Sequence, residues 1–583
     1  MEQTNEKLEV SRHSLSHIMA VVILKLYPNV KFAIGPAVDN GFYYDIDYGE
    51  IKISESDLLN IEEEMKKIIK ANLLFEKSEL SINEALEKEK KSGQIYKEEL
   101  IKDLEKQGKK TVSYYKSGEF EDLCCGPHIK SSGQIQLGSF KLDKIAGAYW
   151  RGDEKNKMLT RIYGLAFNNK TELDNYLKMM EEAEKRDHKK IGKELDLFSF
   201  HDVAPGMPFF HPNGMIIYDA LKNFWIEMQA EFDYKYVYCP SMLDVSIWKQ
   251  SGHWDHYKED MYFLSADEGE KQYALRPMDC PGAILIYNNS LKSYRDLPLR
   301  YAEPGLITRK EKSGQLNGLF RVQQFTQDDA HIFVAADQIK IEIKNIINLV
   351  NKIYQPFGMK CKAYLSTRPD DFMGDAKDWD VAESALKEVL DEVYGLDNYE
   401  LKEKDGAFYG PKIDYQLEDA IGRTWQCATI QLDFQMPLKF GCKYIDNNGK
   451  EARPVLIHRT ILGSFERFMG ILIEHYAGVF PVWLSPVQVK IISVGLSHIE
   501  FCRKLADEFK HNNIRVEIDA SDETVGNKIR KAVIEKAPYM LVIGDREMAS
   551  DKLNIRDRGE KITREIDKEE FIKEVKEKIS EKN

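Results

Sequence analysis

The sequence predicts an α+β multidomain protein, and three observations support this fold class. The chain has 583 residues, which is more than a single hydrophobic core organises, so several domains are expected. The spacing of apolar residues changes along the chain, from helical patterns mixed with short strands to irregular strand order and then to regular strand and helix alternation. A hydrophobic content of 43% with 11% aromatic residues is typical of folded domains.

Residues 1–170 are expected to form an α+β domain, because helical patterns are mixed there with short strand patterns. The segment SESDLLNIEEEMKKIIK at 54–70 places Leu58, Ile61 and Met65 on one face of a helix. Residues 171–196 contain almost only helix-forming residues, which predicts one linker helix.

Residues 197–482 contain most of the prolines and aromatic residues, and their strands and helices do not alternate regularly. This organisation predicts an antiparallel sheet with helices packed on it. Residues 483–583 show strand, helix, strand, helix, strand and a closing helix. That order predicts a small α/β domain.

Composition narrows the possible environment and partners. No apolar run approaches the roughly 18 residues of a membrane span, and the apolar stretch at 18–27 has no basic leader before it. We therefore expect a cytoplasmic protein without a membrane partner. The eight cysteines are scattered, which indicates thiols or metal ligands and not a disulfide framework. A net charge of -13 argues mildly against nucleic acid, although a local basic face can exist on an acidic protein.

The segment QQFTQDDAHIF at 323–333 sets Asp328, Asp329 and His331 between Phe325 and Ile332. Three interpretations compete for this mixture of charged and apolar residues: a salt-bridged core histidine, a general acid/base site, or a metal ligand beside a carboxylate that recognises a substrate. The segment alone favours the core histidine.

Two segments near the start combine histidine and cysteine. HSLSH places His13 and His17 four residues apart, hence on one face if the segment is helical. In DLCCGPH, a turn at 126–127 would return His128 toward Cys124. These side chains could bind zinc, or they could form a metal-free hydrolytic pocket in which a histidine positions water.

Several segments between 308 and 472 could form a nucleotide site that has no glycine-rich phosphate-binding loop. The chain has neither a Walker A loop nor GxGxxG, so a nucleotide would be held by arginines and carboxylates. The segments that could supply them are TRKE at 308–311, RVQQFTQDDAH from 321, DGAFYGPKID from 405, QCATIQLDF from 426 and HRTILGSFERFMGIL from 458.

Together these segments resemble the bacterial threonyl-tRNA synthetases of class II, from about residue 10 nearly to the end. GSFERFMGIL resembles the third class II motif, TRKE the second, and IIYDALKNFWIEMQAEFDYKYVYCP the first, which builds the interface of a homodimer. HSLSH, GPAVDNGFYYD and LCCGPH resemble the threonyl editing domain. The resemblance implies an editing domain (1–170), a class II synthetase antiparallel-sheet catalytic domain (197–482) and a C-terminal α/β anticodon-binding domain (483–583).

The implied activity is ATP-dependent ligation of threonine to tRNA(Thr) through a threonyl-adenylate, with hydrolytic editing of seryl-tRNA(Thr). The resemblance implies one zinc ion per subunit, held by Cys280, His331 and His458. Three protein ligands leave zinc open for the amine and hydroxyl of threonine. Asp329 would accept hydrogen bonds from the same two groups. Valine lacks the hydroxyl and would be rejected strongly.

The other residues implied for synthesis fall into three groups. ATP, with magnesium, would be bound by Arg309, Glu311, Arg321 and Arg467. The threonine side would be lined by Gln327, Tyr409, Lys412 and Gln431. His253 would activate the 2'-hydroxyl of the terminal adenosine of the tRNA.

Serine differs from threonine by one methyl group, and such a contact is worth only ~1 to 3 kcal/mol, so a second site must hydrolyse seryl-tRNA. The resemblance assigns this editing site, without an essential metal, to His13, His17, Tyr44, Lys97, Asp122, Cys124 and His128. Glu547 and Arg556 match positions that contact anticodon bases.

Two departures from the family pattern stand out. The chain begins almost at the editing domain, so we expect it to lack the small ubiquitin-like N-terminal domain, and Ala283 replaces a histidine that often follows CPG. Two alternatives remain. An RNA-binding regulator derived from a synthetase would be expected to have lost Arg309, Arg467 or a zinc ligand, and a hydrolase that only edits would not need the segments from 308 to 467.

Overall fold

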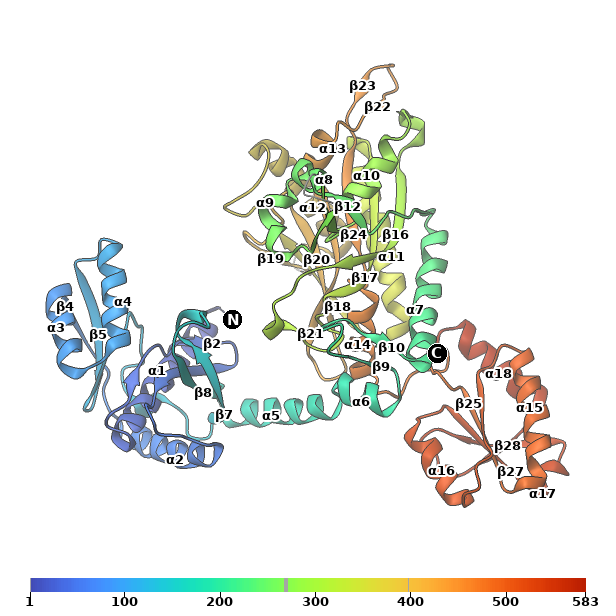
Figure 1. The fold of residues 1–583 in the computed structure, drawn as a ribbon, viewed down its shortest axis with the longest axis horizontal. Helices are drawn as coiled ribbons and strands as arrows, with labels where there is room; N and C mark the ends of the chain where they lie inside the picture. Colours follow the sequence, from blue (N-terminus) through green and yellow to red (C-terminus); the bar gives the residue numbers. More distant parts are fainter. Residues whose placement is uncertain (1, 267–270, 397) are drawn as a thin grey trace. The chain divides into compact units, whose positions relative to one another are not determined.

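A computed structural model describes residues 2–266, 271–396 and 398–583 and confirms the α+β multidomain class (Figure 1). The chain divides into two compact units, Met1–Glu181 and Glu182–Asn583. Within the described ranges, no helix is long and apolar enough to cross a membrane.

Among its described residues, the first unit contains two sheets, four complete α-helices and most of α5 (Lys170–Lys185). The larger sheet has the strand order β1-β3-β8-β7, with β2 paired to β3, and the smaller sheet has the order β4-β5-β6. Its strands are β1 (Lys31–Phe32), β2 (Ala37–Val38), β3 (Gly41–Asp47), β4 (Glu76–Ser81), β5 (Thr111–Ser117), β6 (Phe120–Leu123), β7 (Phe140–Tyr149) and β8 (Met158–Ala166). Its helices are α1 (Glu2–Leu26), α2 (Glu55–Ala71), α3 (Ile82–Ser92) and α4 (Ile95–Lys106).

The helix expected at 54–70 is present, and HSLSH is helical as well. HSLSH lies within α1, so His13 and His17 share a helix face. Helix α2 buries Leu58, Ile61 and Met65, as its spacing predicts.

The single linker helix expected at 171–196 is wrong. The structure has two helices there, α5 (Lys170–Lys185) and α6 (His188–Glu194). The carboxylate of Asp187 accepts a hydrogen bond from the backbone N–H of Lys189 at 2.7 Å, which is the geometry of an N-cap. A cap begins a new helix, so the chain turns at Asp187 although the composition favours helix throughout.

An eight-stranded sheet with the order β11-β16-β17-β24-β21-β20-β18-β19 forms the centre of the second unit. All neighbours are antiparallel except the outermost pairs β11 with β16 and β18 with β19, which are parallel. The strands are β11 (Lys235–Tyr236), β16 (Leu299–Thr308), β17 (Gln324–Val334), β18 (Lys360–Ser366), β19 (Glu400–Lys402), β20 (Lys412–Glu418), β21 (Thr424–Asp433) and β24 (Val455–Thr460).

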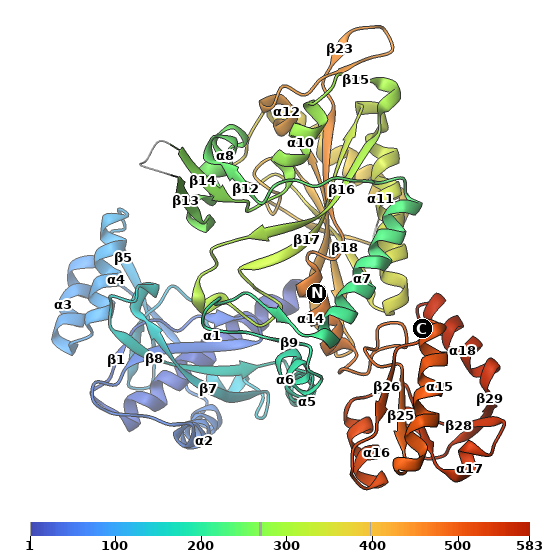
Figure 2. The same ribbon diagram turned by 45° about the vertical axis from the view of Figure 1, so that its right-hand side comes forward.

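The two faces of this sheet differ. One large core joins Ala330, Ile332 and Val334 of β17 to residues of four helices, namely α7 (Pro212–Glu231), α11 (Ile339–Tyr354), α12 (Ala376–Tyr394) and α14 (Phe465–His475). Figure 2 shows α7 and α11 running alongside this sheet. The intervening residues of β17 point to the other face, because side chains alternate along a strand. On that face Phe333 packs with Cys280 of α10 (Cys280–Asn288) in a separate cluster.

The C-terminal part of the second unit is a five-stranded sheet with the order β26-β25-β27-β28-β29. The three parallel strands and their helices match the predicted alternation, and α15 and α16 lie on opposite sides of the sheet (Figure 1). The bounds are β25 (Val489–Ser493), α15 (Ile499–His511), β26 (Val516–Asp519), α16 (Val525–Ile534), β27 (Tyr539–Ile543), α17 (Asp545–Met548), β28 (Lys552–Asp557), β29 (Arg564–Asp567) and α18 (Lys568–Ser580). The antiparallel strands β28 and β29 were not predicted, because six and four residues give a weak pattern.

Candidate functional site

One row of side chains crosses the eight-stranded sheet. His331 of β17 lies directly opposite His458 of β24, which in turn lies opposite Gln431 of β21, and Gln431 lies opposite Lys412 of β20. Directly opposed residues of an antiparallel pair project to the same face. Four side chains assigned to the site from widely separated segments therefore lie side by side on one face.

Cys280 and the two histidines of this row form a group, called the metal group below, whose donor atoms are close enough to hold a metal ion. The thiol and one nitrogen of each imidazole lie within 4.8 Å of one another, and all three residues are buried. The Nε2 atom of His331 is buried without a hydrogen-bond partner. The Nε2 atom of His458 lies 2.9 Å from the carboxylate of Asp433, which leaves Nδ1 for a metal.

These residues fit a zinc ion. One thiol and two imidazoles are a donor set that zinc takes in sites with an open position, and a carboxylate on the second nitrogen of a ligating histidine is a usual companion. Burial raises the pKa of the Cys280 thiol well above its usual value, and nearby carboxylates add to this. A bound zinc ion would counter that effect by stabilising the thiolate.

Asp329 lies beside the metal group among other acids. It is opposite Glu303 in the strand pair, and the side-chain amide of Gln327 donates to its carboxylate at 3.4 Å. Burial raises the pKa of Asp329 well above its usual value, and the carboxylates of Asp279 and Asp328 raise it further. This concentration of negative charge favours a cationic ligand such as an ammonium group.

Whereas Asp329 lies beside the metal group, its neighbour Asp328 stabilises the fold. Its side chain points to the helix-covered face, where its carboxylate accepts hydrogen bonds from the backbone N–H groups of Ile461 and Leu462 at 2.9 Å and of Gly463 at 3.0 Å. Asp328 thus holds the turn that precedes α14. The strand QFTQDDAHIFV combines charged and apolar residues because alternate positions serve a site and a core.

Three arginines and one glutamate were predicted to bind ATP. Arg309 donates from Nε to the carbonyl of Pro277 at 3.1 Å and lies over the ring of Phe325. Arg321 and Glu311 are paired with each other, with Nε of the arginine 2.9 Å from the carboxylate. Arg467 lies in the first turn of α14, and its Nε atom is buried without a partner.

The remaining predicted residues lie around the row. The hydroxyl of Tyr409 donates to the side-chain carbonyl of Gln431, and its ring lies 5.3 Å from that of His458. Lys412 lies 2.9 Å from the carboxylate of Asp414.

His253 is fully buried beside the metal group. Its Nδ1 atom lies 2.7 Å from the hydroxyl of Ser251, and its Nε2 atom lies 3.8 Å from the sulfur of Cys280. Burial lowers the pKa of His253 to about 3. The imidazole is therefore neutral, as a proton acceptor must be.

Sequence reasoning missed several residues that support the site. Arg276, which is buried, donates to Glu303 at 2.8 Å and lies 3.0 Å from the carboxylate of Asp279. Glu466 accepts from the backbone of Thr326 at 2.8 Å, and burial raises its pKa to about 7. The only available signals were the position of Asp279 before Cys280 and the acid in the segment QLDF, which is Asp433.

The first unit contains a pocket of about 760 Å³. Its lining includes five of the seven residues predicted for hydrolysis, namely His13, His17, Lys97, Asp122 and Cys124. The other two contact them, since the hydroxyl of Tyr44 donates to Asp122 and Nε2 of His128 lies 3.3 Å from the sulfur of Cys124. The structure therefore brings all seven together.

Charge in this pocket is arranged around one ion pair. Lys97 lies 2.6 Å from the carboxylate of Asp122. Burial lowers the pKa of His128 to about 2 and that of His17 well below its usual value, and burial raises the pKa of Cys124 to about 12. The pocket thus offers neutral imidazoles and a protonated thiol. One donor atom from each of His13, His17, Cys124 and His128 also lies within 4.8 Å of the others, so the geometry is compatible with both interpretations made from the sequence.

The part of the second unit from β25 to α18 is called the C-terminal sheet domain below. It contains the two residues predicted to read the anticodon. Glu547 is in α17 and accepts from the backbone N–H of Gly544 at 3.0 Å. Arg556 is in β28, and its Nε donates to the carbonyl of Glu560 at 2.7 Å.

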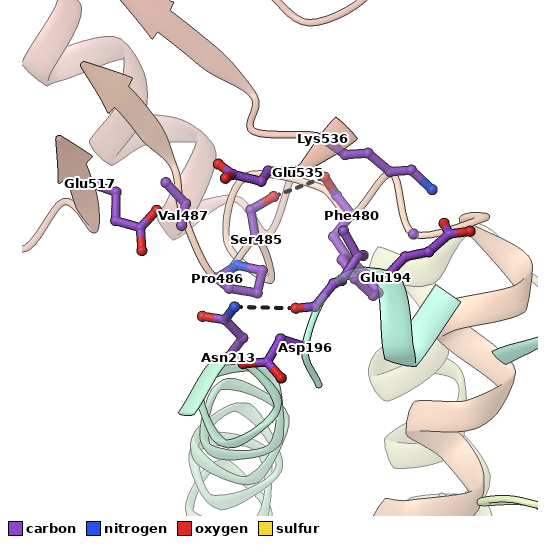
Figure 3. Close-up of a pocket in the computed structure, with 12 residues that line it drawn as sticks. Glu194, Asp196, Asn213, Phe480, Ser485, Pro486, Val487, Glu517, Glu535 and Lys536 are labelled. Carbon is purple, nitrogen blue, oxygen red and sulfur yellow. Dashed lines mark hydrogen bonds between the residues drawn. The ribbon is translucent and has the colours of Figure 1, made fainter. Parts of the chain in front are cut away.

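A smaller cavity of about 210 Å³ lies where the segments at 194–213 and 478–487 meet the C-terminal sheet domain (Figure 3). In Figure 3 the hydroxyl of Ser485 donates a hydrogen bond to the backbone carbonyl of Phe480. The two oxygen atoms lie 3.1 Å apart. Lys536 donates to the carbonyl of Ala477 at 2.7 Å, which ties the C-terminal sheet domain to the end of α14. None of the predicted site residues lines this cavity, which belongs to a domain joint.

Comparison with known proteins accounts for these features. The family described as "tRNA synthetase class II core domain (G, H, P, S and T)" matches residues 262–476, "Anticodon binding domain" matches 488–578, and "Threonyl and Alanyl tRNA synthetase second additional domain" matches 112–163. These matches and the mainly antiparallel eight-stranded sheet define an aminoacyl-tRNA synthetase of class II.

Individual relatives narrow the class. A threonine–tRNA ligase of Clostridium botulinum (strain Kyoto / Type A2) is 53% identical over 571 residues, which is 98% of this chain and 88% of that protein. One from Clostridium kluyveri (strain ATCC 8527) is 52% identical over 580 residues, covering 100% of this chain and 90% of that protein. The RNA binding domain of threonyl-tRNA synthetase from Cryptosporidium parvum Iowa II superposes with a TM-score of 0.65 at 39% identity, covering 67% of this chain and 98% of that one. The chain belongs to the threonine–tRNA ligase family.

The neighbouring acids Asp328 and Asp329 should respond in opposite ways to neutral substitutions. Asp328→Ala removes the acceptor of three backbone N–H groups and should lower the free energy of unfolding by about 3 kcal/mol or more. Asp329→Asn should leave the melting temperature unchanged or raised, because it removes a buried charge, yet abolish threonine activation. Thermal unfolding and ATP–pyrophosphate exchange measure the two effects. A similar loss of stability in both variants would contradict the assignment.

The buried histidines of the first unit should make its stability depend on pH. Their pKa values are lowered in the folded state, so the unfolded chain binds more protons below pH about 6.5 and stability falls as the pH decreases. At pH about 5.5, His128 alone should cost about 1.4 kcal/mol. Thermal unfolding of the full chain at pH about 8 and at pH about 5.5 should show the loss, and His128→Gln should show a smaller one. An equal loss in both proteins would contradict this account.

Proposed function

We propose that this chain joins threonine to tRNA(Thr) in an ATP-dependent reaction through a threonyl-adenylate, and that its first unit hydrolyses seryl-tRNA(Thr). The observation that carries the proposal is the convergence of Cys280, His331 and His458 beside Asp329 on one face of the sheet. Membership of the threonine–tRNA ligase family supports it independently.

Recognition of threonine depends on the row of side chains. Cys280, His331 and His458 would hold one zinc ion per chain, and such an ion would bind the amine and the hydroxyl of the substrate at its open positions. Asp329 accepts hydrogen bonds from the same two groups. These hydrogen bonds offset the free-energy cost of burying its negative charge. Tyr409, Gln431, Gln327 and Lys412 form the walls around the amino acid.

Adenylate formation depends on positioning and on neutralising phosphate charge. Arg309 binds the α-phosphate and the carboxylate of threonine, while Arg321 and Arg467 bind the distal phosphates of ATP, which is bound with magnesium. Arg321 must first exchange its contact with Glu311 for phosphate, and this exchange frees Glu311 for the adenine amine. Neutral His253 is proposed to accept the proton of the 2'-hydroxyl in the transfer step.

Hydrolysis of seryl-tRNA is assigned to the pocket of the first unit. Neutral imidazoles of His13, His17 or His128 can position a water molecule and accept its proton. The protonated thiol of Cys124 is a poor nucleophile, so we assign it to substrate contact. We propose that this pocket acts without an essential metal, which leaves one zinc per chain.

Two further partners follow from this proposal. Glu547 and Arg556 contact anticodon bases of tRNA(Thr), and the active protein is a homodimer in the cytoplasm. The dimer is supported by Tyr236 and Tyr238, which are exposed aromatic residues in and just after the edge strand β11 of the large sheet. Exposed apolar clusters at a sheet edge favour association.

Substitutions in the two sites should have different effects on the zinc content of the protein and on the accuracy of tRNA charging. Cys280→Ser should lose its zinc and its threonine-dependent ATP–pyrophosphate exchange. Cys124→Ala should keep one zinc per chain and normal exchange, yet accumulate seryl-tRNA(Thr). Metal analysis and charging assays with serine test both. Normal exchange by the Cys280 variant would exclude the proposed zinc site, and two zinc ions per wild-type chain would exclude the metal-free pocket.

The proposed dimer can be tested at Tyr238, whose side chain is 83% exposed. Tyr238→Asp should shift the protein toward monomers in analytical ultracentrifugation, because a charge would enter an apolar interface. Ile562→Asp is the matched control, since Ile562 is 82% exposed but lies in the C-terminal sheet domain. Unchanged dimers for Tyr238→Asp, or dissociation by both changes, would contradict this interface.

A further inference from the structure

His188, the first residue of α6, connects the linker to two parts of the nucleotide site. Its side chain is buried, and its Nε2 atom accepts a hydrogen bond from the backbone N–H of Leu319 at 3.0 Å. Its Nδ1 atom lies 2.7 Å from the carboxylate of Glu474. Because a backbone N–H can only donate, Nε2 carries no hydrogen, and the hydrogen on Nδ1 is donated to Glu474.

Leu319 belongs to the turn at 317–321, which closes the loop that begins at Arg309. The turn is held by the backbone N–H of Asn317, which donates to the carbonyl of Arg321 at 3.1 Å. Gly318 has a φ of 49°, and a Cβ atom there would lie 2.1 Å from Nε2 of His188. The ring of Phe320 lies 4.1 Å from the ring of His188. The tip of the loop is therefore packed directly against α6.

The other partner of His188 belongs to α14, the helix that carries Arg467. Glu474 also accepts from the backbone N–H of His188 at 3.0 Å and is paired with Arg423 at 2.6 Å. Arg186 adds a second attachment, donating to the carbonyl of His475 at 2.9 Å. The start of α6 is thus fixed to the end of α14.

One imidazole therefore ties together the two segments from which we propose that ATP is bound. The loop carries Arg309, Glu311 and Arg321, and α14 carries Arg467. We propose that His188 is a positioning residue for ATP: through Leu319 it sets the conformation of the loop relative to α14, so that the linker is part of the nucleotide site. This inference rests on the proposed function, because that function assigns ATP to these arginines.

Two substitutions of His188 separate its two contacts. The amide nitrogen of asparagine can replace Nδ1 as the donor to Glu474, but asparagine is too short to accept from Leu319. Glutamine reaches the position of Nε2 and can accept from Leu319, but it loses the donor to Glu474. His188→Asn should therefore raise KM for ATP by about five- to ten-fold, with KM for threonine changed less than about two-fold. His188→Gln should keep KM for ATP near that of the wild type.

The assay is ATP–pyrophosphate exchange by the full-length protein, with melting temperatures measured for each variant. His211→Asn is a matched control, since His211 also contacts a carboxylate, that of Asp196 at 2.6 Å, but is not bonded to the loop. Gly318→Ala attacks the same contact from the loop side and should reproduce the rise in KM for ATP, which keeps the test informative if His188→Asn folds poorly.

Equal KM values for ATP in His188→Asn, Gly318→Ala and the wild type would overturn the proposal, as would a loss of kcat alone that follows the melting temperature. Calorimetric titration with magnesium ATP separates this failure from that of the proposed function. If the wild type binds ATP without catalysing exchange, weaker binding by His188→Asn still supports the positioning role. If the wild type binds no ATP, both proposals fail.

Discussion

The alternation of side chains across the antiparallel sheet is the constraint on which this molecule depends. Helices bury one face of β17, β24, β21 and β20, so the register of these strands cannot slip without exposing Ala330, Ile332 and Val334. That fixed register places His331, His458, Gln431 and Lys412 in one row. The hydrophobic core thereby determines the geometry of the polar site on the opposite face.

The two sites use similar side chains in different electrostatic surroundings. Around Cys280, the carboxylates of Asp329, Asp433 and Asp279 raise the pKa of the thiol in addition to burial, and this excess of negative charge favours cations. Around Cys124, Lys97 neutralises Asp122, and the histidines are kept uncharged by burial. A buried cluster of acids suits recognition of an amine, whereas neutral imidazoles suit proton transfer from water.

Local patterns predicted the helix at 54–70, the fold class of each part and most C-terminal elements. The prediction of one continuous linker helix was wrong, because Asp187 caps and starts a second helix although the composition favours helix throughout. Cys280, His331 and His458 could be grouped only through family resemblance, because their spacing carries no periodic signal. The contacts of Arg276 with Glu303 and of His188 with Leu319 join distant segments, and no pattern in the sequence indicates them. Such contacts form only when the tertiary fold brings distant segments together, so the local spacing of residues does not predict them.

The most direct test of this account is ATP–pyrophosphate exchange by the metal-analysed protein with threonine, serine and valine compared side by side. The account predicts exchange with threonine, a specificity constant lower by about 10- to 200-fold with serine, and at least about 10⁴-fold lower with valine, because valine would leave the polar groups of the site unpaired. Exchange with valine comparable to that with serine would contradict recognition of the hydroxyl by the row of His331 and His458 beside Asp329.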